Sequence, residues 1–281
     1  MVSEGQAISV VSFKDYDGNY IAPKSANGQM RVIAQDYLLA LAEGDIPNHT
    51  AWSKIGYNPS VTTSQDDCIS ATGSYTFPTV GTTMQISSGN AQDAYPSGEG
   101  ARTINLYYLD SNYAEGSEVL QLSGTTPVNT AGTDIFRVNN MRVASTGTLY
   151  STAGAVSLKA GAVTHGYIRA GFNRQRQLIY TVPANKTLFV SSWSIGAGDM
   201  TVGKTMICTT RATYDNKSGA MLTAGKHFMP YTEIALSNMP FLRNFEEPTR
   251  LPEKTDLKVS CYTTSGGGVC SSRLNGWIEY N

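Results

Sequence analysis

The sequence predicts an all-β protein whose main part is β-sandwich- or jelly-roll-like. Short runs rich in β-branched and aromatic residues recur at intervals of about ten residues, as in sandwiches and barrels. Charged residues make up 15% of the 281 residues, and Ser, Thr, Asn and Gly fill the polar positions instead. Strands and helices do not alternate along the chain, which argues against a doubly wound sheet.

The amino-terminal region is predicted to hold a hairpin and one short helix. Residues 8–13 have the composition of a strand, and Asp15–Asn19 (DYDGN) that of a turn. In residues 30–43 (MRVIAQDYLLALAE), apolar side chains recur at helical spacing. Gly44 follows this run and is a natural end for the helix.

A domain boundary is expected near residue 60, after the run AWSKIGYNP. Residues 1–60 are interpreted as an attachment arm, and residues 61–281 as a β-sandwich domain. The candidate partner contacts are Ile33, Tyr37, Leu38, Leu41 and Trp52. The alternative is that the helix packs against the protein's own sandwich.

The strands of the predicted sandwich begin with a hairpin. Residues 103–109 and 118–122 flank the turn residues Asp110-Ser111-Asn112. Further strands are expected at 135–143, 155–159, 167–170, on both sides of Pro183–Lys186 within 178–198, and at 206–214, 257–263 and 269–280.

Residues 198–205 (GDMTVGKT) match the phosphate-binding loop pattern G-x-x-x-x-G-K-[ST]. A helix must follow such a loop, because its amino terminus supplies the N–H groups that bind phosphate. The residues after Thr205 are MICTT, which favours a strand. We therefore interpret the match as a glycine-containing connection between strands.

Catalytic and metal-binding patterns are weak. The three histidines, His49, His165 and His227, have no metal-ligand spacing, and no G-x-S-x-G sequence occurs. Asp66-Asp67 and Glu246-Glu247 are adjacent acids, which are more often solvated than metal-bound. We expect no enzyme activity, no cofactor and no metal.

The net charge limits the classes of partner that we expect, and the sequence of the amino terminus bears on the state of the cysteines. The formal net charge is −1 and no basic stripe is visible, so neither nucleic acid nor a membrane surface is expected as partner. The start, MVSEGQAISVV, lacks the pattern of a secretory signal. The four cysteines are therefore expected as reduced, buried thiols, although a hairpin disulfide between Cys261 and Cys270 is the alternative.

Four segments carry a resemblance to known proteins: AWSKIGYNP, ARTINLYYLDSNYAEGSEVLQLSGTTPV, DIFRVNNMRVASTGT and IYTVPANKTLFVSSW. They resemble segments of tailed-bacteriophage virion structural proteins of the capsid-associated and fibre type. The resemblance covers about residues 48–198, and its motifs are structural, not catalytic.

This resemblance implies a β-rich virion component that folds in the host cytoplasm and then lies at the particle surface. Its partners would be other virion proteins, either the major capsid protein or tail subunits, and it would form a homo-oligomer, with a trimer preferred. A capsid-attached head fibre or decoration protein is the first interpretation. A tail-fibre or receptor-binding component that recognises host glycans is the alternative, and a glycan-degrading enzyme is a third hypothesis.

Overall fold

The computed structural model describes residues 37–71, 73–200 and 202–281, together with four two-residue strands before them. Those strands form two antiparallel pairs: β1 (Phe13–Lys14) with β2 (Tyr20–Ile21), and β3 (Ser25–Ala26) with β4 (Gln29–Met30). The pairing of β1 with β2 agrees with a hairpin around residues 15–19. Of the strand expected at 8–13, Phe13 belongs to β1, whereas residues 8–12 and the turn lie outside the described residues.

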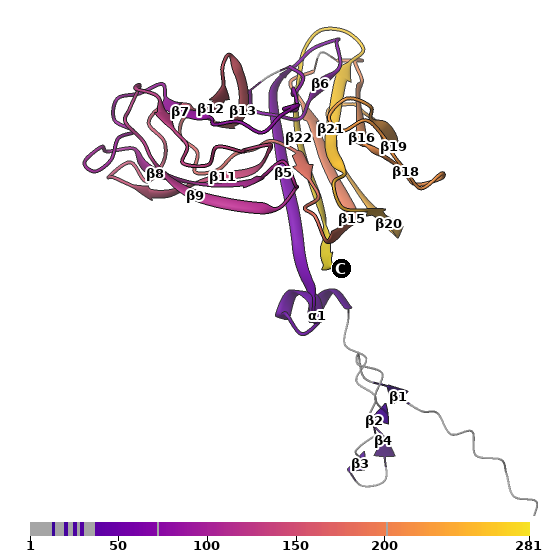
Figure 1. Cartoon of the computed structure of the whole chain (residues 1–281). Helices are drawn as coiled ribbons and strands as arrows, with labels where there is room; N and C mark the ends of the chain where they lie inside the picture. The colour runs from indigo at the N-terminus through magenta and orange to yellow at the C-terminus, as the bar shows by residue number, and fades with distance from the viewer. Residues whose placement is uncertain are drawn as a thin grey trace, which may run out of the picture.

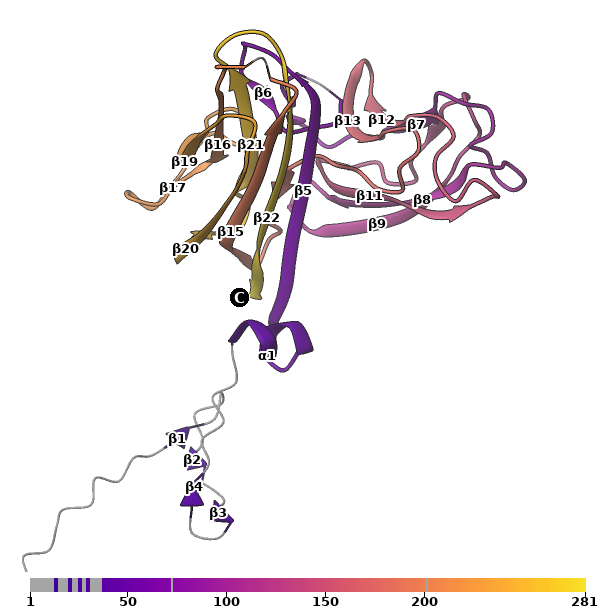
Figure 2. The ribbon, with the colours of Figure 1, turned by 180° about the vertical axis from the view of Figure 1, so that it is seen from behind.

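Among the described residues, one helix, α1 (Tyr37–Glu43), precedes the folded body. It lies at the foot of the long strand β5 (His49–Val61), which it contacts (Figures 1 and 2). Gly44 ends the helix with a φ of 80°, as predicted, because glycine adopts this left-handed backbone without steric cost. The predicted helix began too early: Met30 belongs to β4, and residues 31–36 lie outside the described part.

The body has two lobes that lie side by side (Figure 1). The main lobe holds β5, β6 and β14 to β22, and the inserted lobe holds β7 to β13. The chain therefore enters the main lobe through β5, leaves it to build the inserted lobe, and returns. β5 is the edge of the main lobe that faces the inserted lobe (Figures 1 and 2).

The main lobe contains two antiparallel sheets. We call the first the long sheet; its order is β20 (Pro240–Leu251), β15 (Lys186–Gly198), β22 (Gly268–Tyr280) and β5. The second, the facing sheet, has the order β14 (Ile179–Thr181), β21 (Asp256–Thr263), β16 (Met206–Ala212) and β19 (Met229–Leu236), with β6 (Asp66–Asp67) also paired to β21. A small ribbon of β17 (Tyr214–Asp215) and β18 (Ala220–Met221) adjoins them.

One hydrophobic core fills the space between these two sheets. Leu188 and Val190 of β15 point into it, as do Trp193 and Ile195, and a β-bulge at Ser191 shifts the twofold period between the two pairs. Trp193 is fully buried, and its indole Nε1 donates to the hydroxyl of Ser272 at 2.8 Å. A buried indole N–H without a partner would be unfavourable, so this bond fixes the ring in the core.

All four cysteines are free and buried in this core. Cys208 of β16 lies opposite Cys261 of β21 in the sheet register. Cys68 directly follows β6, and Cys270 lies on β22 of the long sheet. Their Sγ atoms are 3.8 Å apart. The expectation of reduced, buried thiols agrees with this arrangement, and the alternative disulfide between Cys261 and Cys270 is absent from the described structure.

The inserted lobe also contains two small sheets around one core. The first has the order β10 (Val128–Asn129), β7 (Gln85–Ser88), β12 (Val156–Ala160) and β13 (Val163–Ile168). The second has the order β11 (Arg137–Thr146), β8 (Ala101–Leu109) and β9 (Glu115–Gln121). Both contribute buried aliphatic side chains to a shared cluster, among them Ile86, Leu106 and Leu158.

The predicted hairpin is confirmed as β8 and β9. Asp110 forms the turn: its side-chain Oδ1 accepts hydrogen bonds from the backbone N–H groups of Asn112 and Ala114, at 2.8 and 2.9 Å. Tyr113 adopts a φ of 63° in the same turn. The aspartate side chain thus supplies an acceptor for two backbone N–H groups that would otherwise lack a partner in the turn.

The all-β prediction is confirmed, but a single β-sandwich or jelly roll over residues 61–281 is wrong. The strands form small sheets in two lobes, because the segment from β7 to β13 closes around its own core. The boundary near residue 60 also cuts through β5, which is an integral strand of the long sheet. The attachment role of the preceding residues stays a prediction.

Candidate functional site

The predicted contact residues do not form one exposed surface. Leu41 is buried, and the Trp52 ring packs edge-on against Tyr180 with centroids 5.1 Å apart. Tyr37 is 41% exposed and its ring meets that of Trp277 at 5.3 Å. Ile33 lies outside the described residues, and only the backbone of Leu38 is described. For Leu41, the alternative of packing within the protein's own body agrees with the structure, and Trp52 of β5 also packs there.

The phosphate-loop pattern is followed by a strand, as predicted. Gly198 ends β15 and Met206 begins β16. Asp199 and Gly203 have φ values of 54° and 79°, typical of a turn between strands. With no helix amino terminus at this place, the dipole and N–H groups that bind phosphate are missing from residues 202–212.

Asp66 and Asp67 are buried, which corrects the expectation that these acids are solvated. Asp67 accepts hydrogen bonds from the Tyr75 N–H and the Ser260 hydroxyl, both at 2.7 Å. It also pairs with the ammonium of Lys258 at 3.1 Å. The carboxylate is therefore occupied by structural contacts.

Sequence reasoning missed β20, a long strand whose residues are mostly exposed. It forms the edge of the long sheet away from the inserted lobe and, among the described strands, pairs with β15 alone (Figures 1 and 2). From Pro240 to Arg250, Phe245 and Thr249 are partly buried and all other residues are exposed. Because most residues on both faces of the strand are exposed, its sequence shows none of the alternation that marks a half-buried strand.

An open groove of about 590 Å³ crosses the outer face of the long sheet beside β20. Phe241 and Leu242 line it, and they are 42% and 62% exposed. Exposed apolar side chains gathered at an unpaired sheet edge are typical of a protein contact.

A second cleft, of about 310 Å³, lies between the two lobes. β5 and β14 of the main lobe and β8, β9 and β11 of the inserted lobe all contribute to its lining. The charged side chains of the lining are Lys54, Glu115, Arg142 and Arg174. Its aromatic side chains are Trp52, Tyr107 and Tyr180.

Lys54 lies at the wall of this interlobe cleft and is buried. Its ammonium donates to the backbone carbonyl of Asn139. Burial, with the positive charge of Arg174 second, lowers the pKa of Lys54 to about 7. Arg142 and Arg174 lie next to each other because their backbones form a β-bridge, so the cleft concentrates positive charge.

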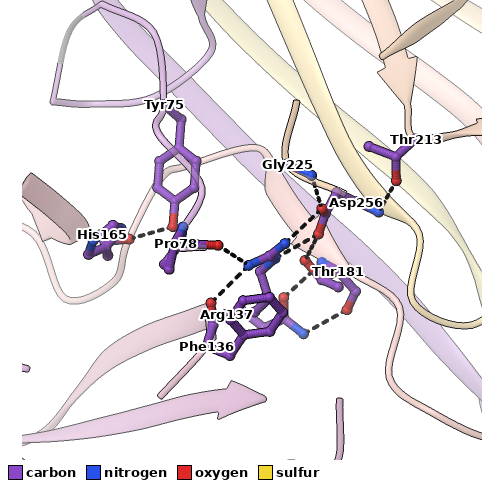
Figure 3. A network of polar contacts seen from close by, with 10 residues as sticks. Tyr75, Pro78, Phe136, Arg137, His165, Thr181, Thr213, Gly225 and Asp256 are labelled. Carbon is purple, nitrogen blue, oxygen red and sulfur yellow. Dashed lines mark hydrogen bonds and ion pairs between the residues drawn. The ribbon is translucent and has the colours of Figure 1, made fainter. Parts of the chain in front are cut away.

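A buried ion pair joins the lobes beyond this cleft. The guanidinium of Arg137 on β11 donates to both carboxylate oxygens of Asp256 on β21, at 2.8 and 3.0 Å (Figure 3). Asp256 also accepts from the Thr181 hydroxyl at 2.5 Å and the Gly225 N–H at 2.7 Å. Every partner of this carboxylate is a donor, so the negative charge is fully matched despite its burial.

His165 lies close to this network (Figure 3). Tyr75 donates from its hydroxyl to the His165 carbonyl at 3.4 Å. Burial, with the charge of Arg137 second, lowers the pKa of His165 to about 4. The imidazole is therefore neutral at pH 7.

Within the described residues, no three His, Cys, Asp or Glu side chains are arranged to hold a metal ion. The same part of the chain contains no helix of the length and apolar character that a membrane crossing requires.

No protein-family model and no curated protein matches the chain. Among solved structures, it is similar to a structure of infectious bursal disease virus Gt strain, at 10% identity, 86% coverage of this chain, 77% of the other and a TM-score of 0.22. It is also similar to a structure of the Gx strain, at 12% identity, 87% coverage of this chain, 78% of the other and a TM-score of 0.20. A third similar structure is the VP2 subviral particle of the same virus, at 10% identity, 86% coverage of this chain, 77% of the other and a TM-score of 0.18. Backbones with such TM-scores do not superimpose, so these likenesses carry no argument.

Proposed function

We propose that the protein is a non-enzymatic virion structural protein that assembles with copies of itself through the edge strand β20. Its place would be the head of a tailed bacteriophage, as a fibre or decoration protein. The observation that carries the proposal is the exposure of β20, an edge strand in which nine of 12 residues are exposed. The resemblance of four sequence segments to virion proteins supports the class.

An uncovered edge strand favours contact with another chain. Its outer N–H and C=O groups lack ladder partners, and its apolar side chains stay in water until a partner covers them. Met239, Phe241 and Leu242 are exposed together at this edge. Residues 245–248 bulge opposite Ser191, and Pro248 interrupts the ladder, so side chains would carry most of the contact.

The charges of β20 favour a second copy as the occupant. Arg243 and Arg250 flank Glu246 and Glu247 on the same exposed strand. When two such strands run antiparallel, an arginine of one can face a glutamate of the other. A symmetric contact of this kind is self-complementary, as twofold interfaces require.

Attachment to the particle is assigned to the residues before β5, with the major capsid protein as the preferred partner. Many copies on a symmetric lattice would bind firmly even if each contact is weak. A tail location, with tail subunits as partners, is the alternative.

Light scattering coupled to gel filtration tests the assembly. We expect an oligomer for the wild type and a monomer for Leu242→Glu, because a charge would be buried in the contact. Val119→Glu is the matched control, since Val119 is 64% exposed on β9 of the other lobe. A monomeric wild type at micromolar concentration, or an oligomer that resists Leu242→Glu, would contradict the proposal.

Deletion of residues 1–36 tests the attachment arm and leaves α1 on β5. We expect the shortened protein to keep its oligomeric state but to stop co-purifying with virus particles. Full incorporation of the shortened protein would remove the arm from the proposal.

A further inference from the structure

We propose that the interlobe cleft binds a small ligand that carries an oxyanion, and that Arg174 and Gln175 are contact residues. The ligand class is a monosaccharide-sized acid or a phosphate ester. The inference goes beyond the assembly role, because β20 lies at the opposite edge of the long sheet.

The first support is the side chain of Gln175. It lines the cleft and is 3% exposed, yet neither its Nε2 nor its Oε1 has a hydrogen-bond partner within the described structure. A buried amide with both ends unpaired is unfavourable by about 1–3 kcal/mol for each group. Both amide atoms are shielded from solvent, so a bound ligand with one donor and one acceptor would satisfy them once the side chain turns toward the cleft.

The second support is the charge of the lining. Lys54, Arg142 and Arg174 contribute three basic side chains to the lining of the cleft. The single acid of the lining, Glu115, is already paired with Lys186 at 2.5 Å. The cleft therefore keeps an excess of positive charge, which an oxyanion would match.

The third support is the state of Lys54. Its pKa of about 7 means that burial and the charge of Arg174 oppose its protonation. An anion in the cleft would remove this opposition, because it adds an opposite charge close to the ammonium.

Size and shape limit the ligand. A volume of about 310 Å³ is at the lower end of small-molecule sites. The rings of Trp52 and Tyr107 give the lining apolar surface, and the Arg142 guanidinium already lies over Tyr107 at 5.1 Å from its centroid. A ligand with one flat apolar face and one anionic group fits this combination.

Isothermal titration calorimetry at low ionic strength tests the inference with three probes: glucuronate, inorganic phosphate and glucose. We expect saturable binding of at least one anion and at least tenfold weaker binding of glucose. Binding of glucuronate indicates an acidic saccharide, whereas binding of phosphate alone indicates a phosphate ester. If neither anion binds, or if glucose binds as well as glucuronate, the inference is wrong.

Two variants locate the site. Arg174→Gln changes an exposed side chain and should weaken anion binding at least tenfold without loss of folding. Gln175→Leu removes the unpaired amide and should also weaken binding. Lys159→Gln, which removes an exposed charge on β12, is the control and should change the affinity less than twofold. Anion binding that survives both cleft variants would overturn the assignment.

The oligomer test and the ligand test are independent. A monomeric protein that still binds an anion would contradict the assembly proposal and leave the cleft assigned. An oligomer that binds no anion would contradict the cleft assignment and leave the assembly proposal standing.

Discussion

Arg137 and Asp256 lie 119 positions apart in the chain and form a buried bidentate ion pair, with Nε–Oδ1 at 2.8 Å. Arg137 belongs to the inserted lobe and Asp256 to the main lobe, so the pair links two separate hydrophobic cores. The guanidinium also lies over the Phe136 ring at 3.9 Å and donates to the Pro78 carbonyl at 2.7 Å. We expect it to fix the relative position of the lobes.

Removing one partner of this pair should destabilise the protein strongly. Arg137→Met leaves the Asp256 charge buried and should lower the free energy of unfolding by about 3–5 kcal/mol. Urea denaturation followed by tryptophan fluorescence measures this. The double variant Arg137→Met/Asp256→Leu should lose less free energy of unfolding than Arg137→Met alone, because no unpaired charge remains buried. A single variant as stable as the wild type would contradict this role.

His165 should make the protein less stable in acid. Its folded pKa is about 4 and its unfolded value about 6.5, so the unfolded chain binds more protons between these pH values. Its contribution is fully present above about pH 6.5 and falls by up to roughly 3 kcal/mol as the pH drops to 4. His165→Gln should flatten this part of the stability profile. His227→Gln, at an exposed position, is the control and should leave the profile unchanged.

Deprotonation of Lys54 should make the stability of the protein depend on pH in the alkaline range. Its folded pKa of about 7 lies below its ordinary 10.5, so the unfolded chain binds more protons within this window. The free energy of unfolding should therefore rise with pH across it, by a few kcal/mol at most. Lys54→Met should remove this rise, and Lys159→Met should keep it. A parallel profile for wild type and Lys54→Met would show that the ammonium is solvated.

Gly276 should tolerate no side chain. A Cβ atom there would overlap the carbonyl oxygen of Phe189, at the point where β15 bulges beside β22. Gly276→Ala should therefore cost about 3 kcal/mol or prevent folding. Gly198→Ala is the matched control, because no atom lies within 4 Å of its added Cβ. Equal melting temperatures for the two variants would contradict this packing.

The cysteines should react as four buried thiols. Contact with Cys270, followed by burial, raises the pKa of the Cys68 thiol, and the thiolate is the reactive form. Ellman's reagent should therefore label none of them in the native protein and all four in urea. Fewer than four reactive thiols in urea without reductant would indicate a disulfide.

Local chemistry made several elements predictable. The turn at Asp110, the helix end at Gly44 and the strand after Thr205 each depend on a few neighbouring residues, and the structure contains all three. Several strands were not predicted, among them β5, β7, β19 and β20. In β19 and β20 the exposed and half-buried residues follow no regular period, so the hydrophobic pattern that identifies most strands was missing.

The sequence by itself determined the all-β class, the β8–β9 hairpin and the strand that replaces a phosphate-binding helix, because turn and strand chemistry act between close neighbours. Only the tertiary structure decided that there are two lobes, that Arg137 meets Asp256, and that Lys54 and Gln175 line one cleft. These residues come from segments far apart in the chain. Their contacts arise because each lobe closes around its own apolar core, and no local pattern encodes where two such cores meet.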